Sequence, residues 1–346
     1  MFKNFSSRLF TFAILILISA CATKPAEFAE PPPSALAPGF DAELTGYQYP
    51  FPVQKFTLEA QKQSLQMSFM DLKSEKQDSE VIVLLHGKNF GGYAFGKVAT
   101  RLQTMGYRVI IPDQIGFGKS SKPTNFQYSF QALASMTNQL LEAQGVKKYV
   151  LLGHSMGGML ATRMALMYPE KISKLILVNP IGLEDWKLMT TYKSIEETYR
   201  DELKSTSESI KKYQSDAYYA GTWKPEYDPL IEAASGWTKN PDFPLIAWNS
   251  ALTSDMAFTQ PVVYEFKNLK VRTALIIGQR DKTALGKAWA TEENKKKMGL
   301  YPQLGRSANK LIPRSKLYEL KGLGHLPFVE NFDQFFAEGL VPALKL

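Results

Sequence analysis

The sequence predicts an α/β fold in which helices cover both faces of a mostly parallel sheet. Strands of the buried type recur along the chain, at residues 81–87, 107–113, 148–155, 174–180, 273–281 and 316–322. Segments with the apolar spacing of helices separate the first three of them, and each of these segments ends in glycine. Near-continuous apolar strands that alternate with helices indicate a parallel sheet whose two faces are both buried.

Two shorter stretches precede the first of these strands. Residues 49–60 and 64–74 alternate partly between apolar and polar side chains, and we expect them to form a pair of strands. The chain has 346 residues, of which 45% are hydrophobic and 21% charged, an ordinary globular composition. This length suits one large α/β domain that carries an insertion, or two small domains.

The regular alternation of strands and helices stops after residue 180 and resumes near residue 263. Residues 181–262 are rich in Tyr, Trp, Lys and Glu and contain no strand of the buried type. A structureless loop of that length is uncommon in a compact domain, so we expect helices there. The predicted organisation is a core of residues 48–180 and 263–346, with residues 181–262 inserted as a helical cap.

The first 47 residues differ in character from the rest. Residues 1–20 join a basic start to an apolar run that is too short to span a bilayer and is typical of a secretory signal. Small residues precede Cys21, the only cysteine, and resemble the bacterial lipobox, in which the cysteine is cleaved free and acylated. Residues 21–47, rich in Pro and Ala, are typical of an extended tether. Because Ala22 rather than Asp follows the cysteine, we expect a periplasmic lipoprotein anchored in the outer membrane.

A serine stands where a predicted strand becomes a helix. Ser155 lies between Gly153 and Gly157 in a G-x-S-x-G pattern. A strand that turns sharply into a helix presents one side chain at the edge of the sheet, and small residues must flank it because backbone passes close by. The amide of Met156, at the start of the helix, is then free to bind an oxyanion. Ser155 is the predicted nucleophile.

A serine hydroxyl needs a base, and three histidines are available. His325 follows the last predicted strand and precedes a predicted final amphipathic helix, which is where a base is expected if that loop folds over the sheet edge. His154 lies inside the turn, where its ring should point away from the serine. We assign His86, which lies at the end of strand 81–87, a structural role.

A carboxylate must orient the imidazole and stabilise its cation. Asp281 ends strand 273–281, at the same edge of the sheet as the serine and the base. The competing residue is Asp185, which lies in the loop after the preceding strand. We favour Asp281 because it comes directly off a strand end.

Other classes of function lack support in the sequence. The net charge is +8, but the lysines are dispersed and no nucleic-acid motif accompanies them, so we expect no nucleic-acid partner. Scattered histidines and one cysteine cannot build a closed zinc site, and we expect no metal and no cofactor. Residues 113–120, "DQIGFGKS", end like a phosphate-binding loop, but Asp113 stands where that loop needs glycine. We interpret them as a turn beneath the cap.

From about residue 48 to its end the chain resembles the serine-nucleophile branch of the α/β-hydrolase superfamily. The matching stretches include "LLHGKNFGG", "YRVIIPDQIGFGKSSKP", "LLGHSMGGMLATRMALMYPE", "LIIGQRD" and "GHLPFVE". The resemblance implies an eight-stranded sheet with a helical cap after strand six, and the chain order Ser155, Asp281, His325. It also implies an oxyanion hole formed by the backbone amides of Lys88 and Met156.

These features predict a monomeric serine hydrolase that cleaves an acyl bond, with a carboxylic ester of an apolar acyl or aryl group as the expected small-molecule substrate. The same three side chains would serve a carbon–carbon bond hydrolase, a lactonase or an acyltransferase, and the family resemblance does not choose between them. A non-catalytic binding protein of this fold is a further alternative, against which the complete set of Ser, His and Asp argues.

Overall fold

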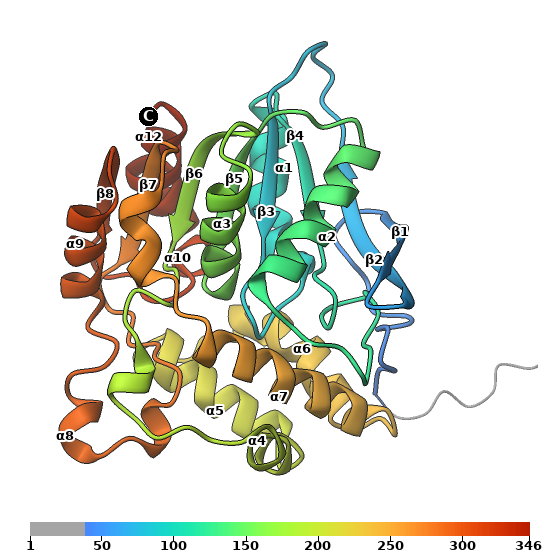
Figure 1. Cartoon of the computed structure of the whole chain (residues 1–346), viewed down its shortest axis with the longest axis vertical. Coiled ribbons are helices and arrows are strands. Elements are labelled where there is room, and N and C mark those ends of the chain that lie inside the picture. The colour runs from blue at the N-terminus through green and yellow to red at the C-terminus, as the bar shows by residue number, and fades with distance from the viewer. Residues whose placement is uncertain (1–38) are drawn as a thin grey trace, which may run out of the picture. The chain divides into compact units, whose positions relative to one another are not determined.

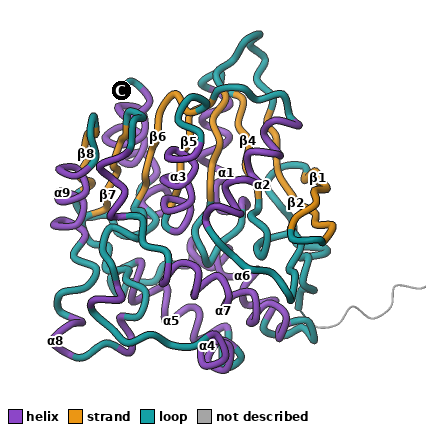
Figure 2. The backbone as a smooth tube through the Cα atoms, viewed as in Figure 1, coloured by secondary structure: helices purple, strands orange, loops and turns teal. Residues whose placement is uncertain are grey.

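An eight-stranded sheet forms the centre of the computed structural model, which describes residues 39–346 (Figures 1 and 2). In chain order the strands are β1 (Val53–Ala60), β2 (Gln63–Leu72), β3 (Val81–Leu85), β4 (Arg108–Pro112), β5 (Tyr149–His154), β6 (Ile172–Val178), β7 (Thr273–Gly278) and β8 (Ser315–Leu320). Their order across the sheet is β1-β2-β4-β3-β5-β6-β7-β8. Only the β1–β2 and β2–β4 pairs are antiparallel. The predicted mostly parallel, eight-stranded sheet is confirmed.

The predicted signal, Cys21 and the first part of the tether lie outside the described residues. Within residues 39–346, no helix combines the length and the apolar character that crossing a membrane requires.

Helices cover both faces of the sheet, as the sequence predicts (Figure 2). One face packs against α2 (Phe130–Ala143), α3 (Met156–Met167) and α9 (Tyr301–Leu311). The other packs against α1 (Gly96–Thr104) and the C-terminal helices α10 (Pro327–Glu330), α11 (Phe332–Gln334) and α12 (Val341–Leu344). Every residue of β5 and β7 is therefore buried, which explains why their sequences are continuously apolar.

The chain end forms short helices in place of one continuous amphipathic helix. Asn331 has an extended backbone, with φ −152° and ψ 91°, and so interrupts the helix between α10 and α11. Its side chain then accepts a hydrogen bond from the amide of Gln334 (3.1 Å) and caps the next segment. Residues Phe335–Leu340 form a π-helical turn before α12.

Four helices lie between β6 and β7 and gather at one edge of the sheet (Figure 1). They are α4 (Ile195–Glu202), α5 (Ser207–Tyr218), α6 (Asp228–Trp237) and α7 (Phe243–Thr259), and we call them the cap helices. The sequence marks their starts: Ser194 and Glu197 form a reciprocal capping box before α4, and Thr206 and Ser209 form one before α5. One further short helix, α8 (Glu292–Lys295), lies between β7 and α9.

The glycine-rich segment after β4 closes around a carboxylate of the chain itself. Asp113 accepts hydrogen bonds from the amide of Gly92 (2.6 Å), the amide of Lys119 (2.8 Å) and the hydroxyl of Tyr49 (2.7 Å). Gly118 has φ +49°, and a Cβ at this residue would collide with the Asp113 carboxylate. The loop that resembles a phosphate-binding loop therefore holds Asp113 where such a loop would hold a phosphate.

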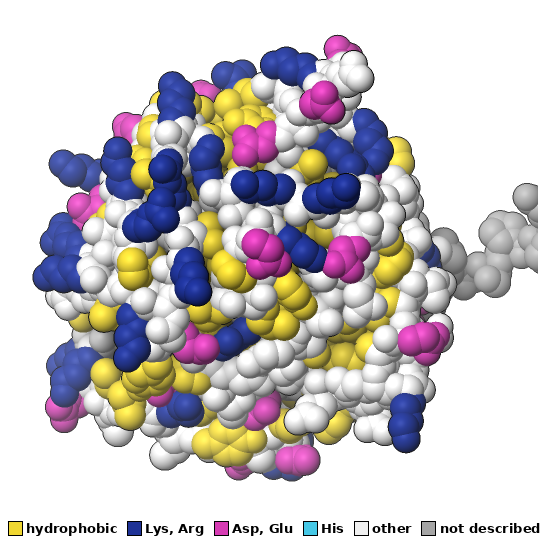
Figure 3. All heavy atoms as spheres, turned by 45° about the horizontal axis from the view of Figure 1, so that its top comes forward, with side chains coloured by type: hydrophobic (Ala, Val, Ile, Leu, Met, Phe, Trp, Pro, Cys, Tyr) yellow, Lys and Arg dark blue, Asp and Glu magenta, His cyan; other side chains and the backbone are white. Residues whose placement is uncertain are grey.

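Charged side chains are mixed on the face drawn in Figure 3, where Lys and Arg lie among Asp, Glu and hydrophobic side chains. Many lysines are paired with carboxylates of the same chain, including Lys171 with Glu142 (2.6 Å) and Lys211 with Asp228 (2.9 Å). Many positive charges are thus offset locally by carboxylates, and on the face drawn the basic side chains are interspersed with acidic ones.

Candidate active site

The turn between β5 and α3 holds Ser155 in the left-handed region of backbone space, with φ +55° and ψ −121°. Both flanking glycines are needed because a larger side chain would collide with neighbouring backbone. A Cβ at Gly153 would collide with the carbonyl oxygen of Gly157, and a Cβ at Gly157 would collide with that of Leu85. A non-glycine residue held at positive φ stores strain, a feature that clusters at functional sites. This geometry is that of a nucleophile elbow at the carboxyl end of a central strand.

His325 and Asp281 form a buried pair at the same edge of the sheet. Nδ1 of His325 lies 2.7 Å from Oδ2 of Asp281, and neither side chain is exposed. The carboxylate is held in turn by the side-chain amide of Asn179, which donates to Oδ2 (2.8 Å), and by the backbone amide of Thr283, which donates to Oδ1 (2.8 Å). These donors keep the carboxylate aligned with the imidazole, so that Nδ1 carries the proton and Nε2 offers a lone pair.

The competing carboxylate lies elsewhere. Asp185 accepts a hydrogen bond from the hydroxyl of Tyr264 (2.9 Å) and one from the backbone amide of Lys187 (3.1 Å). The structure therefore brings Asp281, and not Asp185, to the imidazole of His325.

The Nε2 atom of His325 is buried and has no hydrogen-bond partner within residues 39–346. The Oγ atom of Ser155 makes no hydrogen bond with it in this state. The two loops are nevertheless tied together, because Nε2 of His154 donates to the carbonyl oxygen of His325 (2.9 Å). Hydrogen bonds between nucleophile and base often tighten only when substrate is bound. The imidazole thus presents an unused basic nitrogen beside the elbow.

The loop after β3 passes over the serine. A Cβ at Gly87 would lie only 2.9 Å from Cβ of Ser155. The next residue is Lys88, and its backbone amide donates to no group within the described part of the chain, nor does that of Met156 at the start of α3. The two amides named as the oxyanion hole thus come from the two segments that meet at Ser155.

The other two histidines are satisfied by the backbone. Nε2 of His86 accepts from the amide of Gln114 (3.1 Å), and its Nδ1 donates to the carbonyl oxygen of Gly87 (2.9 Å). Burial lowers the pKa of His86, and burial together with the nearby His325 lowers that of His154 far more. Both rings are therefore neutral, with roles in holding the loops.

Three residues at this site escaped the sequence analysis. The ring of Tyr218, at the end of α5, stacks on His325 with centroids 4.5 Å apart, and its hydroxyl accepts from the side-chain amide of Asn89 (2.7 Å). The backbone carbonyl oxygen of Tyr218 also accepts a hydrogen bond from the backbone amide of His325 (3.1 Å). Asn179 follows β6 directly, and a polar residue at the end of a buried strand was a usable signal. No pattern in the cap sequence marks Tyr218.

A cavity of about 450 Å³ lies between the loop after β3 and the cap helices. Most of its lining side chains are apolar, among them Phe90, Phe117, Ile210, Phe243 and Ile246. Ser155 and His325 are not in its wall. Tyr213, which lines it, packs edge-on against Tyr218, and Tyr218 in turn stacks on His325. The cavity therefore ends two aromatic rings from the imidazole.

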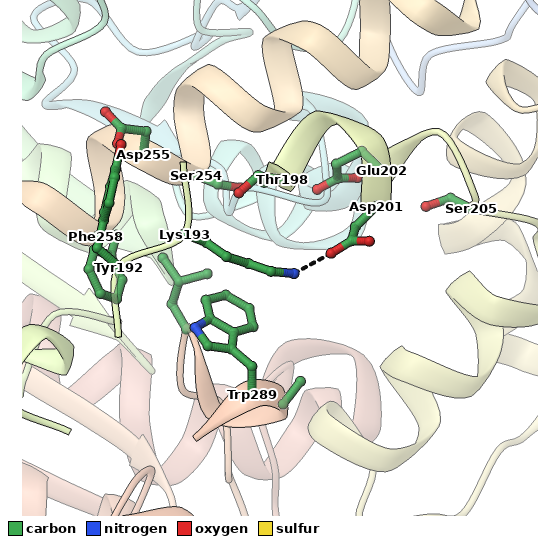
Figure 4. Close-up of a pocket in the computed structure, with 12 residues that line it drawn as sticks. Tyr192, Lys193, Thr198, Asp201, Glu202, Ser205, Ser254, Asp255, Phe258 and Trp289 are labelled. Carbon is green, nitrogen blue, oxygen red and sulfur yellow. Dashed lines mark hydrogen bonds and ion pairs between the residues drawn. The ribbon is translucent and has the colours of Figure 1, made fainter. Parts of the chain in front are cut away.

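A second cavity of about 350 Å³ adjoins the first and shares with it Glu202, Ser205, Ser254 and Leu285 (Figure 4). Trp289 and Leu285 belong to the long connection between β7 and α9, so this connection contributes to the cavity wall. Within residues 39–346, no group of three or more His, Cys, Asp or Glu side chains is arranged to hold a metal ion.

Comparisons with known proteins agree with this architecture. Residues 80–217 match a family model described as the alpha/beta hydrolase fold. The crystal structure of a probable hydrolytic enzyme from Pseudomonas aeruginosa is 45% identical to this chain, with a TM-score of 0.87, over 90% of this chain and 99% of that one. Lipase 1 of Psychrobacter immobilis is 28% identical over 74% of each chain. A 2-hydroxy-6-oxo-6-phenylhexa-2,4-dienoate hydrolase of Comamonas testosteroni is 33% identical over 32% of this chain and 40% of its own length.

Proposed function

This chain belongs to the α/β-hydrolase family and is a hydrolase, and from that premise we propose that it cleaves carboxylic esters through Ser155, His325 and Asp281. The observation that carries the proposal is the buried 2.7 Å contact between Nδ1 of His325 and Oδ2 of Asp281, with Nε2 of the same ring left without a partner beside the elbow. An imidazole held in this way can act as a general base through its unprotonated Nε2 atom.

The proposed reaction has two halves. Oγ of Ser155 attacks the ester carbonyl carbon while Nε2 of His325 takes the hydroxyl proton, and Asp281 stabilises the imidazolium that forms. The amides of Lys88 and Met156 bind the oxyanion, a contribution of about 3 kcal/mol per donor in comparable sites. The C–O bond to the alcohol then breaks, and His325 returns the proton to the leaving oxygen. Water attacks the acyl-enzyme with the same base and releases the acid.

Replacement of the nucleophile tests this reaction. Ser155→Ala should lower kcat/KM for p-nitrophenyl butyrate by about 10⁴-fold or more, because the attacking oxygen is gone. Ser173→Ala is the matched control: its hydroxyl only contacts Glu80 (3.2 Å), near the start of β6, and activity should be unchanged. Undiminished hydrolysis by a folded Ser155→Ala protein would remove the proposal.

One relative favours a second reaction for the same residues. The similarity to a dienoate hydrolase makes carbon–carbon bond cleavage the alternative, in which the same serine and base act on a vinylogous diketone. A panel that offers simple esters beside such a dienoate separates the two, because an esterase hydrolyses the esters faster. A non-catalytic binding protein would leave every member of the panel intact and would not react with a fluorophosphonate.

We further propose that the protein is a periplasmic lipoprotein, tethered through acylated Cys21 to the outer membrane. The support is the signal-like segment 1–20, the small residues before Cys21 and the Pro- and Ala-rich stretch that follows. Globomycin, which blocks lipoprotein signal cleavage, should cause a larger precursor to accumulate. Processing that is insensitive to globomycin, together with an unchanged membrane fraction for Cys21→Ser, would contradict the anchor.

A further inference from the structure

The larger cavity contains a lysine whose ammonium group has donors to spare. Nζ of Lys88 donates to Oγ of Ser250 (2.8 Å), and Oε1 of Glu202 lies 3.8 Å away, beyond hydrogen-bond distance. An ammonium carries three N–H donors, so two of them have no hydrogen-bond acceptor within residues 39–346. The Lys88 side chain is 15% exposed and that of Glu202 is 31% exposed, so the cation is the more deeply buried charge.

The surroundings of Lys88 make this incomplete pairing costly. The cavity wall is mostly apolar, so water solvates the ammonium poorly, and burial lowers the pKa of Lys88 while the charge of Glu202 acts to raise it. Gln214 in the same wall is also buried, and its Oε1 has no partner within the described residues; this atom is an acceptor, so it would take a donor of the ligand and not its carboxylate. Buried polar groups without partners are rare in proteins and indicate a missing ligand or water.

Lys88 joins the elbow to the cavity: its backbone lies beside Ser155, and its ammonium reaches the cap residues Ser250 and Glu202. Lys88 directly follows Gly87, the residue packed against Ser155, and its backbone amide is one of the two proposed oxyanion donors. If an ester carbonyl binds at the two oxyanion amides, the adjacent part of the substrate would lie along the Lys88 side chain and extend into the cavity.

The smaller cavity provides a contrast. There Lys193 donates directly to Asp201, and its Nζ lies over the Trp289 ring, 4.9 Å from the centroid (Figure 4). The Lys193 ammonium thus has a direct hydrogen bond to a carboxylate, whereas the ion pair of Lys88 with Glu202 is wider, at 3.8 Å. Glu202 lines both cavities, so its carboxylate can also be solvated from the smaller one. Lys88 lines only the larger cavity.

We propose that Lys88 binds a carboxylate of the substrate, so that the enzyme prefers esters with a negative charge on the part that enters the larger cavity. This inference rests on the proposed esterase function and names its substrate class. In the free protein the ion pair with Glu202 (3.8 Å) and the hydrogen bond to Ser250 hold the ammonium in place. A substrate carboxylate would instead form a charge-assisted hydrogen bond with the free donors.

Matched pairs of esters test the preference on either side of the scissile bond. On the acyl side, the mono-p-nitrophenyl ester of adipic acid is compared with p-nitrophenyl hexanoate and with its 6-trimethylammonio derivative. On the alcohol side, 4-butyryloxybenzoate is compared with phenyl butyrate. We expect kcat/KM to favour the anionic member of at least one pair by about 10-fold or more, the scale of one hydrogen bond to a charged group.

Variants separate recognition from a merely structural role of the pair. Lys88→Met should lower the anionic-to-neutral ratio by about 10- to 100-fold, Lys88→Arg should keep it, and Glu202→Gln should raise it because a repelling carboxylate is gone. Lys193→Met, in the neighbouring cavity, is the control and should leave the ratio unchanged. A ratio at or below one in both pairs, a preference for the cationic ester, or an unchanged ratio in Lys88→Met would overturn the inference.

A binding measurement keeps this test independent of catalysis. Adipic acid monoanilide and hexananilide, which are amides of matched shape, are titrated calorimetrically into Ser155→Ala and into the double variant with Lys88→Met. The anionic amide should bind about 10-fold more tightly, and only while Lys88 is present. Equal affinities would contradict the inference even if ester hydrolysis were never observed, whereas tighter anion binding without hydrolysis would contradict the esterase function alone.

Discussion

Two glycine-rich turns follow parallel strands of the same sheet and differ in one respect. In the closed turn, residues 113–120 after β4, the carboxylate of Asp113 accepts the amide of Lys119 and, from the neighbouring loop, that of Gly92. The open turn, residues 153–158 after β5, leaves the amide of Met156 without an acceptor within the described residues. Glycine gives both turns room for close backbone contact. What separates them is whether the chain supplies its own anion, and only the turn without one can stabilise an anion formed in a reaction.

The largest effect is expected from removing the carboxylate that holds His325, the base that serves the open turn. Asp281→Asn should lower kcat for p-nitrophenyl butyrate by about 10⁴-fold, because an amide cannot hold the tautomer that leaves Nε2 free to accept a proton. Initial rates at saturating substrate measure this. Asp185→Asn is the matched control, since Asp185 contacts Tyr264 and not His325, and its kcat should stay within about twofold of the wild type. Similar losses in both variants would contradict the assignment.

The closed turn should respond in stability. Asp113→Ala leaves the buried amides of Gly92 and Lys119 and the hydroxyl of Tyr49 without their acceptor, at a cost of about 3 to 5 kcal/mol in free energy of unfolding. Urea unfolding measures the loss. Asp216→Ala, which removes only an exposed ion pair with Lys212, should cost less than about 1 kcal/mol. If the two variants lost similar stability, the closed turn would not depend on its internal carboxylate.

The contact between the cap and the open turn gives a smaller effect on rate. Tyr218→Leu removes the ring stacked on His325 and should lower kcat by about 10-fold, with less change in KM. Tyr218→Phe keeps the ring and removes only the bond from Asn89, so its loss should be smaller. Stopped-flow or steady-state measurements of kcat and KM for both variants distinguish the contribution of the ring from that of the hydroxyl. Equal losses would assign the effect to the hydroxyl alone.

The two neutral histidines, one beside each turn, predict a modest pH dependence of stability. Burial holds the pKa of His86 and of His154 below 6.5 in the folded state, so the unfolded chain binds more protons below that pH. The contribution of these histidines to stability is therefore fully present above about pH 6.5 and decreases as the pH falls below it, by at most about 1.4 kcal/mol per pH unit for each histidine. Urea unfolding between about pH 7.5 and 5.5 should show a shallower slope for His86→Gln than for the wild type. Parallel slopes would mean that His86 does not titrate differently in the two states.

The sequence predicted most of what lies on the strands. Apolar runs identify strands buried on both faces, and residues directly after such strands must meet at one edge of a parallel sheet. That logic predicts that Ser155, Asp281 and His325 lie together, and the structure brings Asp281 to within 2.7 Å of His325. It also favoured Asp281 over Asp185, which the structure puts on Tyr264.

The contributions of the cap were beyond the sequence pattern. Tyr218 reaches His325 from 107 positions earlier in the chain, and Glu202 lies 114 positions from Lys88. Such contacts depend on how the helices pack on the sheet edge. Helical periodicity indicates which face of a helix is apolar, but it does not identify the residues that this face contacts. The interruption at Asn331 was also missed, because the apolar spacing continues across it although the backbone does not.

Covalent labelling of the nucleophile tests the central claim most directly. A fluorophosphonate reacts only with a serine that a base has activated, so incubation followed by peptide mass spectrometry locates the activated residue. The account predicts a single adduct on Ser155 that His325→Ala abolishes. An adduct on another serine, or a folded wild-type protein that remains unlabelled, would contradict it.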